Sequence, residues 1–258
     1  MDSGRLHLFP GLPSAPEGFT RTVRVWLPDA YQTSPGERFP VLYLQDGQNV
    51  FTHPSSAPVH PWGVERTLTD LAREGLGTWM AVGVDSGPGR LAEYSPFDEP
   101  ALDIRARGEP YLRFLSEQLK PWVDAHFRTR PGPGHTAVAG SSMGGLISLW
   151  LGYTRPERFS RVAALSPTAM WGSGELFRRL RHLPASPLRL YLDAGAREHL
   201  SIGGMELDYG RAAGDLHAHL TALGYPRDFL RLVLEPGGEH HERDWQRRLP
   251  AALRWLLA

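Results

Sequence analysis

The chain has 258 residues, of which 41% are hydrophobic, and this is enough for a sizeable core. Its 28 Lys and Arg residues balance 28 Asp and Glu residues, so the formal net charge is zero, and it contains no cysteine. This composition excludes disulfides, thiolate metal sites and a cysteine nucleophile, and it argues against nucleic-acid or anionic-membrane partners, which are bound through an excess of basic residues.

Lysine chemistry and membrane segments are also not expected. Lys120 is the only lysine and lies beside Pro121, so neither a P-loop nor a Schiff-base lysine has an obvious candidate. Residues 1–18 lack the apolar run of a secretory signal, and no stretch approaches the roughly 20 apolar residues of a membrane span. We therefore expect a cytoplasmic protein without a membrane partner.

Short apolar runs bounded by turn residues alternate with longer segments that have apolar residues three and four positions apart. The short runs are typical of strands, and the central ones are apolar at every position, as in strands covered on both faces. The longer segments are typical of helices. The predicted strands are residues 22–27, 40–45, 80–84, 135–139, 162–165, 188–192 and 229–234, and the predicted helices are residues 62–73, 109–127 (with a kink at Pro121), 143–153, 211–223 and 245–257.

This alternation predicts an α/β fold with a mostly parallel central sheet and helices on both faces. Without an internal repeat or a linker, residues 1–258 are expected to form one domain. Ligands of such folds bind beyond the carboxyl ends of the strands, where the long or polar connections 46–61, 166–187 and 194–210 are candidates for pocket walls.

Four aromatic residues on or beside these connections are candidates for an aromatic pocket wall. Packing in the core is the role that we favour for each of them taken singly. They are Trp62, Trp171, Phe51 and Tyr209.

The pattern GSSMG at residues 140–144 joins an apolar strand to an apolar helix. In this context it predicts a nucleophile elbow, whose turn requires glycine because a Cβ would collide with neighbouring backbone. The spacing selects Ser142 as the nucleophile, since Ser141 would need a glycine where Ala139 stands. The alternative is that Gly and Ser merely begin a helix here.

A serine nucleophile needs a histidine base, which needs an orienting carboxylate, and the expected chain order is Ser, acid, His. His240 and His241 precede the last helix and both are candidates for the base. Asp193 and Glu198 follow a predicted strand and both are candidates for the acid. We favour Glu198 because it lies further into the loop; Asp193 is expected to stabilise the turn.

The oxyanion of an ester-cleaving reaction needs preorganised N–H donors. One is expected to be the backbone N–H of Met143, directly after the serine. The other is expected from the loop after the predicted strand 40–45.

Motifs spread over residues 41–257 resemble the esterase D or putative esterase family of α/β hydrolases, which includes relatives of enterochelin esterases, feruloyl esterases and mycolyltransferases. In chain order they are YLQDGQNVF, Arg90 with EYSP, AGSSMGGLISLW, LSP, DAGARE and PGGEHHERDW. The resemblance implies the α/β-hydrolase fold, with the second oxyanion amide at Gln48, the acid at Glu198 and the base at His240. The chain departs from the family pattern in its glutamate, where aspartate is common, and in His241, where asparagine often follows the base.

Together these features predict a serine ester hydrolase that forms an acyl-enzyme on Ser142 and needs no metal or organic cofactor. Its partner would be a small or medium ester that the sequence does not identify, and the sequence predicts no oligomeric state. The alternatives are an acyltransferase with the same intermediate, a non-catalytic binding protein with the same fold, and a metal-dependent hydrolase that uses His240 and His241.

Overall fold

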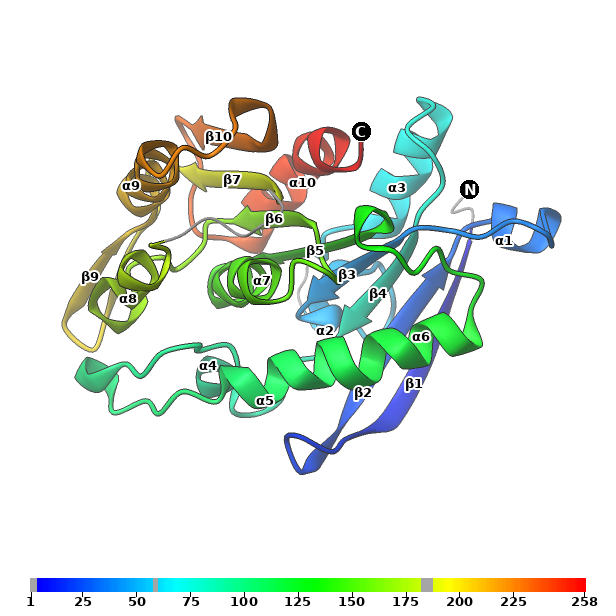
Figure 1. Ribbon diagram of the computed structural model, residues 1–258, viewed down its shortest axis with the longest axis horizontal. Coiled ribbons are helices and arrows are strands. Elements are labelled where there is room, and N and C mark those ends of the chain that lie inside the picture. The colour runs from blue at the N-terminus through cyan, green and yellow to red at the C-terminus, as the bar shows by residue number, and fades with distance from the viewer. Residues whose placement is uncertain (1–3, 58–59, 182–187) are drawn as a thin grey trace.

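Strands and helices alternate along most of the computed structural model, which describes residues 4–57, 60–181 and 188–258 (Figure 1). The strands are β1 (Arg5–Ser14), β2 (Phe19–Leu27), β3 (Val41–Gln45), β4 (Met80–Val84), β5 (Thr136–Ser141), β6 (Arg161–Leu165), β7 (Arg189–Gly195), β8 (His199–Ile202), β9 (Met205–Asp208) and β10 (Leu230–Glu235). The helices are α1 (Ala30–Thr33), α2 (Gly47–Val50), α3 (Val64–Arg73), α4 (Arg90–Glu93), α5 (Gly108–Arg113), α6 (Lys120–His126), α7 (Met143–Thr154), α8 (Trp171–Arg179), α9 (Tyr209–Ala222) and α10 (Glu242–Leu257).

The central sheet has eight strands in the order β1-β2-β4-β3-β5-β6-β7-β10. The strands from β4 to β10 in this order are parallel to one another, whereas β1 and β2 join antiparallel at one edge. The predicted α/β-hydrolase fold with a mostly parallel sheet is therefore confirmed. Because neighbouring strands are parallel, the loops after β3, β5, β7 and β10 all leave from the carboxyl ends of the strands, which together form one edge of the sheet.

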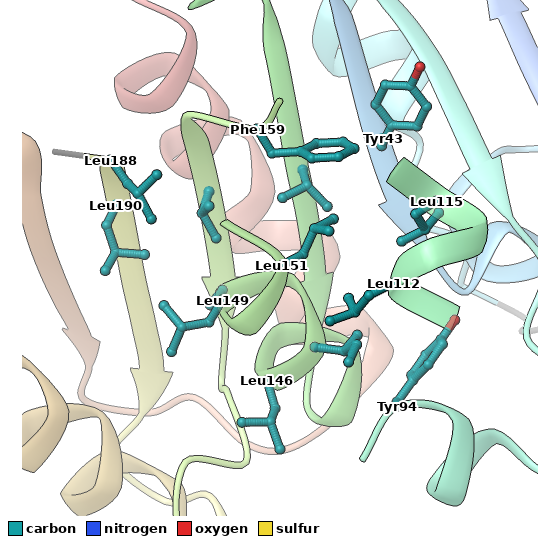
Figure 2. Packing of buried hydrophobic residues seen from close by; sticks show 14 of the residues in the cluster. Tyr43, Tyr94, Leu112, Leu115, Leu146, Leu149, Leu151, Phe159, Leu188 and Leu190 are labelled. Carbon is teal, nitrogen blue, oxygen red and sulfur yellow. The ribbon is translucent and has the colours of Figure 1, made fainter. Parts of the chain in front are cut away.

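Alternate residues of the parallel strands face two separate hydrophobic layers. Val41 and Tyr43 of β3 belong to the layer that packs against α5, α6, α7 and α9. Leu42 and Leu44 belong to the layer that packs against α3 and α10 on the opposite face. Figure 2 shows the first layer, in which leucines of α5 and α7 lie between the helices and the sheet. Two covered faces explain why these strands are apolar at every position.

Elements without an apolar run escape sequence-based prediction. Strand β1 lies at the sheet edge, exposes most of its side chains and contains Pro10 and Pro13. The two-stranded sheet of β8 and β9 is also largely exposed. Helix α8 begins with a glycine-rich turn in which residues 172–174 have left-handed backbone angles. The expected pocket loops 46–61 and 166–187 include residues 58–59 and 182–187, which lie outside the described part of the chain.

Segment 109–127, for which we expected a kink at Pro121, contains a π-helical turn, Phe114–Leu119, directly before α6, and α6 includes Pro121. Pro121 lacks an N–H, so the carbonyl of Ser116, five residues earlier, has no donor from that position. This carbonyl instead accepts a hydrogen bond from the guanidinium of Arg158. Among the described residues, no helix is long and apolar enough to span a bilayer.

Two helical glycines provide a matched test of the packing between α7 and the sheet. A Cβ on Gly152 of α7 would lie 2.4 Å from Val162 Cγ2 of β6, whereas a Cβ on Gly214 of α9 meets nothing within 4 Å. Gly152→Ala is expected to lower the free energy of unfolding by about 1–3 kcal/mol through overpacking. Gly214→Ala should raise it by about 0.5–1 kcal/mol, because alanine favours a helix more than glycine does. Chemical denaturation of both variants checks this, and equal effects would contradict the close approach.

Candidate active site

The residues predicted for catalysis all follow parallel strands at one edge of the sheet. Gln48 follows β3, Ser142 follows β5, Glu198 follows β7 and His240 follows β10. In the sequence they are spread over most of the chain. The parallel arrangement brings them together, because each strand delivers its following loop to the same edge.

Ser142 occupies a strained turn between β5 and α7. Its φ is 55° and its ψ is −124°, which a residue with a Cβ rarely adopts. A Cβ on Gly140 would lie 2.5 Å from the carbonyl oxygen of Gly144, and a Cβ on Gly144 would lie 3.0 Å from Gln45 Cβ. The two glycines of the pattern therefore permit the tight turn that presents the serine, as expected from the sequence.

Ser142, His240 and Glu198 form a continuous chain of close contacts. His240 Nε2 lies 3.0 Å from Ser142 Oγ, and His240 Nδ1 lies 3.0 Å from Glu198 Oε2. The exposed neighbour His241 instead caps α10, where its Nδ1 accepts a hydrogen bond from the backbone N–H of Arg243. Of the two candidate histidines, only His240 thus contacts the serine.

The carboxylate of Glu198 is fully buried and uses its two oxygens for different partners. Oε1 accepts hydrogen bonds from the Gly195 N–H (2.8 Å), the Ser166 hydroxyl (2.9 Å) and the Arg248 guanidinium (2.8 Å). Oε2 is left for His240. Burial alone would raise the pKa of Glu198, but the hydrogen bond to His240 and the charge of Arg248 outweigh it and lower the pKa. Glu198 is therefore ionised when it faces the imidazole.

Asp193, the other candidate acid, lies behind Glu198 and is fully buried. One of its oxygens accepts a hydrogen bond from the Ser166 N–H, and the other lies 3.4 Å from Arg248 Nε. Burial raises the pKa of Asp193 to about 7, against the opposing charge of Arg248, and the nearby Glu198 adds to the rise. No contact joins Asp193 to His240 among the described residues.

Both expected oxyanion amides lie in the first turn of a helix, where the N–H groups have no intrahelical acceptor. Met143 is the first residue of α7, and Gln48 is the second residue of α2. Asp46, just before α2, has a left-handed φ of 53°. Arg90 donates two hydrogen bonds of 2.7 and 2.8 Å to the carboxylate of Asp46, and the backbone N–H of Asp46 donates to the Tyr94 hydroxyl. Arg90 and Tyr94 thus stabilise the loop that carries Gln48.

The aromatic residues proposed as a pocket wall lie in different environments. Trp62 and Trp171 are each only 3% exposed and pack in the hydrophobic layers, and Phe51 is likewise buried. Trp62 also lines a groove between α3 and α10 and donates a hydrogen bond to Glu242. The contacts of the described residues place neither tryptophan beside Ser142. Tyr209, in contrast, lies against the ring of His240, with the two centroids 4.0 Å apart.

Sequence reasoning missed the buried polar residues behind the acid. Arg248 and Trp245 of α10 both donate hydrogen bonds to the hydroxyl of Ser166. One signal of their role is present in the sequence: Trp245, Arg248, Leu249 and Ala252 have the spacing of one helix face, so Arg248 is a cation in an apolar stripe. A buried cation requires a buried partner, which here is the carboxylate of Glu198.

Among residues 4–57, 60–181 and 188–258, no cluster of three or more His, Asp or Glu side chains could hold a metal ion. His240 and His241 have different partners, and the carboxylate that faces His240, that of Glu198, also accepts hydrogen bonds from Arg248 and the Gly195 N–H. The described residues bring the hydroxyl of Ser142, the imidazole of His240 and the carboxylate of Glu198 into consecutive contact.

Comparison with known proteins identifies the family of the chain. The profile of the putative esterase family matches residues 15–256. YbbA, an uncharacterized protein of Bacillus subtilis (strain 168), is 24% identical over 241 residues, which cover 92% of each chain. The ferri-bacillibactin esterase BesA of the same organism is 23% identical over 269 residues, and the match covers 85% of this chain and 87% of BesA.

A solved structure of a ferulic acid esterase superposes with a TM-score of 0.75 over 99% of this chain and 98% of that chain, at 17% sequence identity. At this identity the likeness shows the fold, while the family match covers nearly the whole chain. The protein therefore belongs to the putative esterase family and is a carboxylic ester hydrolase with the α/β-hydrolase fold.

Proposed function

We propose that the protein hydrolyses a small or medium ester through an acyl-enzyme intermediate on Ser142, with His240 as the base and Glu198 as the acid of a catalytic triad. The observation that carries this proposal is the pair of 3.0 Å contacts that link Ser142 Oγ through His240 to Glu198. A serine hydroxyl is a weak nucleophile at neutral pH, and a hydrogen-bonded imidazole is the group that activates it.

In the first half-reaction, His240 Nε2 takes the proton of Ser142 as Oγ attacks the carbonyl carbon of the ester. Negative charge develops on the carbonyl oxygen, to which the N–H groups of Gln48 and Met143 donate. The carbon–oxygen bond to the alcohol then breaks, and His240 gives its proton to the departing alkoxide. The acyl group is left on Ser142.

In the second half-reaction, water attacks the acyl-enzyme while His240 takes a proton from it. The carboxylic acid leaves, and His240 returns a proton to Ser142 Oγ. Glu198 remains ionised throughout and stabilises the imidazolium, because its pKa is lowered by the hydrogen bond to His240 and the charge of Arg248 against the effect of burial.

The different contacts of the two buried carboxylates support Glu198, and not Asp193, as the acid. Three donors converge on Oε1 of Glu198 and hold Oε2 towards His240 Nδ1. This contact requires the proton of the neutral imidazole on Nδ1, so Nε2 is free to accept the serine proton. Asp193 makes no such contact in the described part of the chain.

The substrate is proposed only as a carboxylic ester. One relative is named as a ferri-bacillibactin esterase and one structural neighbour as a ferulic acid esterase, so their names point to esters of different structure. A panel of p-nitrophenyl esters of increasing acyl length, together with phenolic and lactone esters, would establish which acyl group this site accepts.

Replacement of the nucleophile is the direct test of the proposal. Ser142→Ala is expected to lower kcat for a short p-nitrophenyl ester by about 10³-fold or more, since it removes the hydroxyl that His240 contacts, and to abolish labelling by a fluorophosphonate probe. Ser141→Ala, at the neighbouring buried serine, is the control and should keep both properties. A chelator should not change the activity of the wild type. Full turnover by Ser142→Ala would overturn the mechanism.

Replacement of each carboxylate separates the two candidate acids. In Glu198→Gln, the donors at Oε1 should attract the amide oxygen and turn the NH₂ group towards His240 Nδ1. This stabilises the imidazole tautomer that carries its proton on Nε2, which then cannot accept the proton of Ser142. We expect kcat to fall by about 10²- to 10⁴-fold. Asp193→Asn should lower kcat by less than about tenfold, because this residue contacts Arg248 and the Ser166 N–H but not His240. The reverse order of effects, measured at equal folded fraction, would make Asp193 the acid.

The raised pKa of Asp193, about 7 in the folded protein, also predicts a pH-dependent stability. Between about pH 4 and 7 the folded state holds a proton that the unfolded state lacks, so this residue's contribution to stability is lost as the pH rises. Asn cannot ionise, so Asp193→Asn lacks this loss. The Tm of the variant minus the Tm of the wild type should therefore be a few degrees larger at about pH 8 than at about pH 5. Exposed Asp228→Asn is the control, and a constant difference for both variants would contradict the prediction.

A further inference from the structure

Tyr209 lies beside all three residues of the proposed triad. Its backbone N–H donates to the carbonyl of Glu198 at 3.0 Å. Its ring lies over the imidazole of His240, with centroids 4.0 Å apart and an interplanar angle of 31°. The residue is 2% exposed, and hydrogen bonding of its hydroxyl with Thr168 and Ser142 acts to lower its pKa.

We propose that Tyr209 is a positioning residue of the active site, whose hydroxyl orients Ser142 and whose ring orients His240 for proton transfer. This inference rests on the proposed function, because it assigns a role within the same reaction. The role has two parts that can be separated by mutation, one for the hydroxyl and one for the ring.

The hydroxyl part follows from the donors and acceptors around Ser142. A neutral tyrosine has one proton to donate, and donation to Ser142 Oγ leaves the proton of the serine directed at His240 Nε2, 3.0 Å away. Thr168 Oγ1 lies 3.4 Å from Ser142 Oγ and completes the group of hydroxyls. As Ser142 loses its proton, the negative charge on Oγ strengthens the hydrogen bond from Tyr209, so the contact favours the transition state.

The acid–base state of Tyr209 suits a donor. Burial raises the pKa of Tyr209 above its usual value, and the hydrogen bonds with Thr168 and Ser142 only partly oppose this effect. The hydroxyl therefore keeps its proton while the imidazole of His240 takes and returns the proton of Ser142.

The ring part follows from the two aromatic residues around the imidazole. Tyr209 covers one face of His240, and Trp245 meets it edge to face at 4.8 Å and 86°. This packing restricts rotation of the imidazole, which must point Nδ1 at Glu198 and Nε2 at Ser142 together. The aromatic face also stabilises the positive charge that His240 carries after it takes the serine proton.

The chain path explains why Tyr209 is held at this place. Strands β8 and β9 form a hairpin in which His199 pairs with Asp208. The residues just outside this pair are Glu198 and Tyr209, which the backbone hydrogen bond joins. The hairpin therefore leaves from the proposed acid and returns directly at the tyrosine, so both residues keep their relative position.

Two variants and one control test this role, with kcat and KM for a p-nitrophenyl ester expressed per active site titrated by a fluorophosphonate. Tyr209→Phe removes only the hydroxyl and should lower kcat by about three- to tenfold with KM nearly unchanged. Tyr209→Leu also removes the ring and should lower kcat further, to a total of about 10- to 100-fold. Tyr225→Phe is the control, because its buried hydroxyl bonds to the Leu188 carbonyl, away from the site. It should lower Tm without changing kcat per site.

The outcomes are distinct. If both Tyr209 variants keep the wild-type kcat per titrated site, or if they change Tm alone as Tyr225→Phe does, the positioning role is wrong. A higher KM at unchanged kcat would make Tyr209 a substrate contact and would also overturn the role. If Tyr209→Leu does not fold, Tyr209→Phe decides by itself. Failure of the proposed function is recognised separately, by turnover in Ser142→Ala.

Discussion

The buried ion pair between Arg248 and Glu198 is the interaction on which the geometry of the site depends. Both side chains are almost fully buried, and their contact of 2.8 Å fixes one oxygen of the carboxylate. Removal of Arg248 would leave the buried carboxylate of Glu198 without its cation, and breaking a buried ion pair typically costs about 3–5 kcal/mol. The other oxygen is thereby directed at His240, which in turn lies beside Ser142. A residue of the last helix thus determines the orientation of a side chain in the loop after β7.

Backbone strain is concentrated at the same edge of the sheet. Asp46, Ser142 and Ser166 each follow a parallel strand and have positive φ angles of 53°, 55° and 43°. Each of these strained residues is held by several hydrogen bonds, for example those from Arg90 to Asp46 and from Arg248 to Ser166. Strained conformations persist where the surroundings over-determine them, and the sheet with its two covered faces provides such a support.

The strands and helices of the core were predictable because their buried faces require apolar residues at regular positions. Parallel strands apolar at every position and helices with an apolar stripe leave a strong pattern in the sequence. Strand β1, the β8–β9 hairpin and the distorted start of α8 leave none, because they lie at exposed edges or depend on glycine. Trp62 and Trp171 lie beside predicted pocket loops, and both side chains pack in the core, which is the role that we favoured for each from the sequence.

The sequence by itself determined the fold class, the serine in its glycine turn and the order of the candidate residues, because these depend on local spacing and local backbone requirements. It left Asp193 and Glu198, and His240 and His241, as alternatives, since neighbours in the chain share the same local pattern. The tertiary structure decided which of them contact one another, because Arg248, Trp245 and Tyr209 reach the site from distant helices. Those contacts depend on the packing of α9 and α10 beside the sheet, which no local pattern encodes.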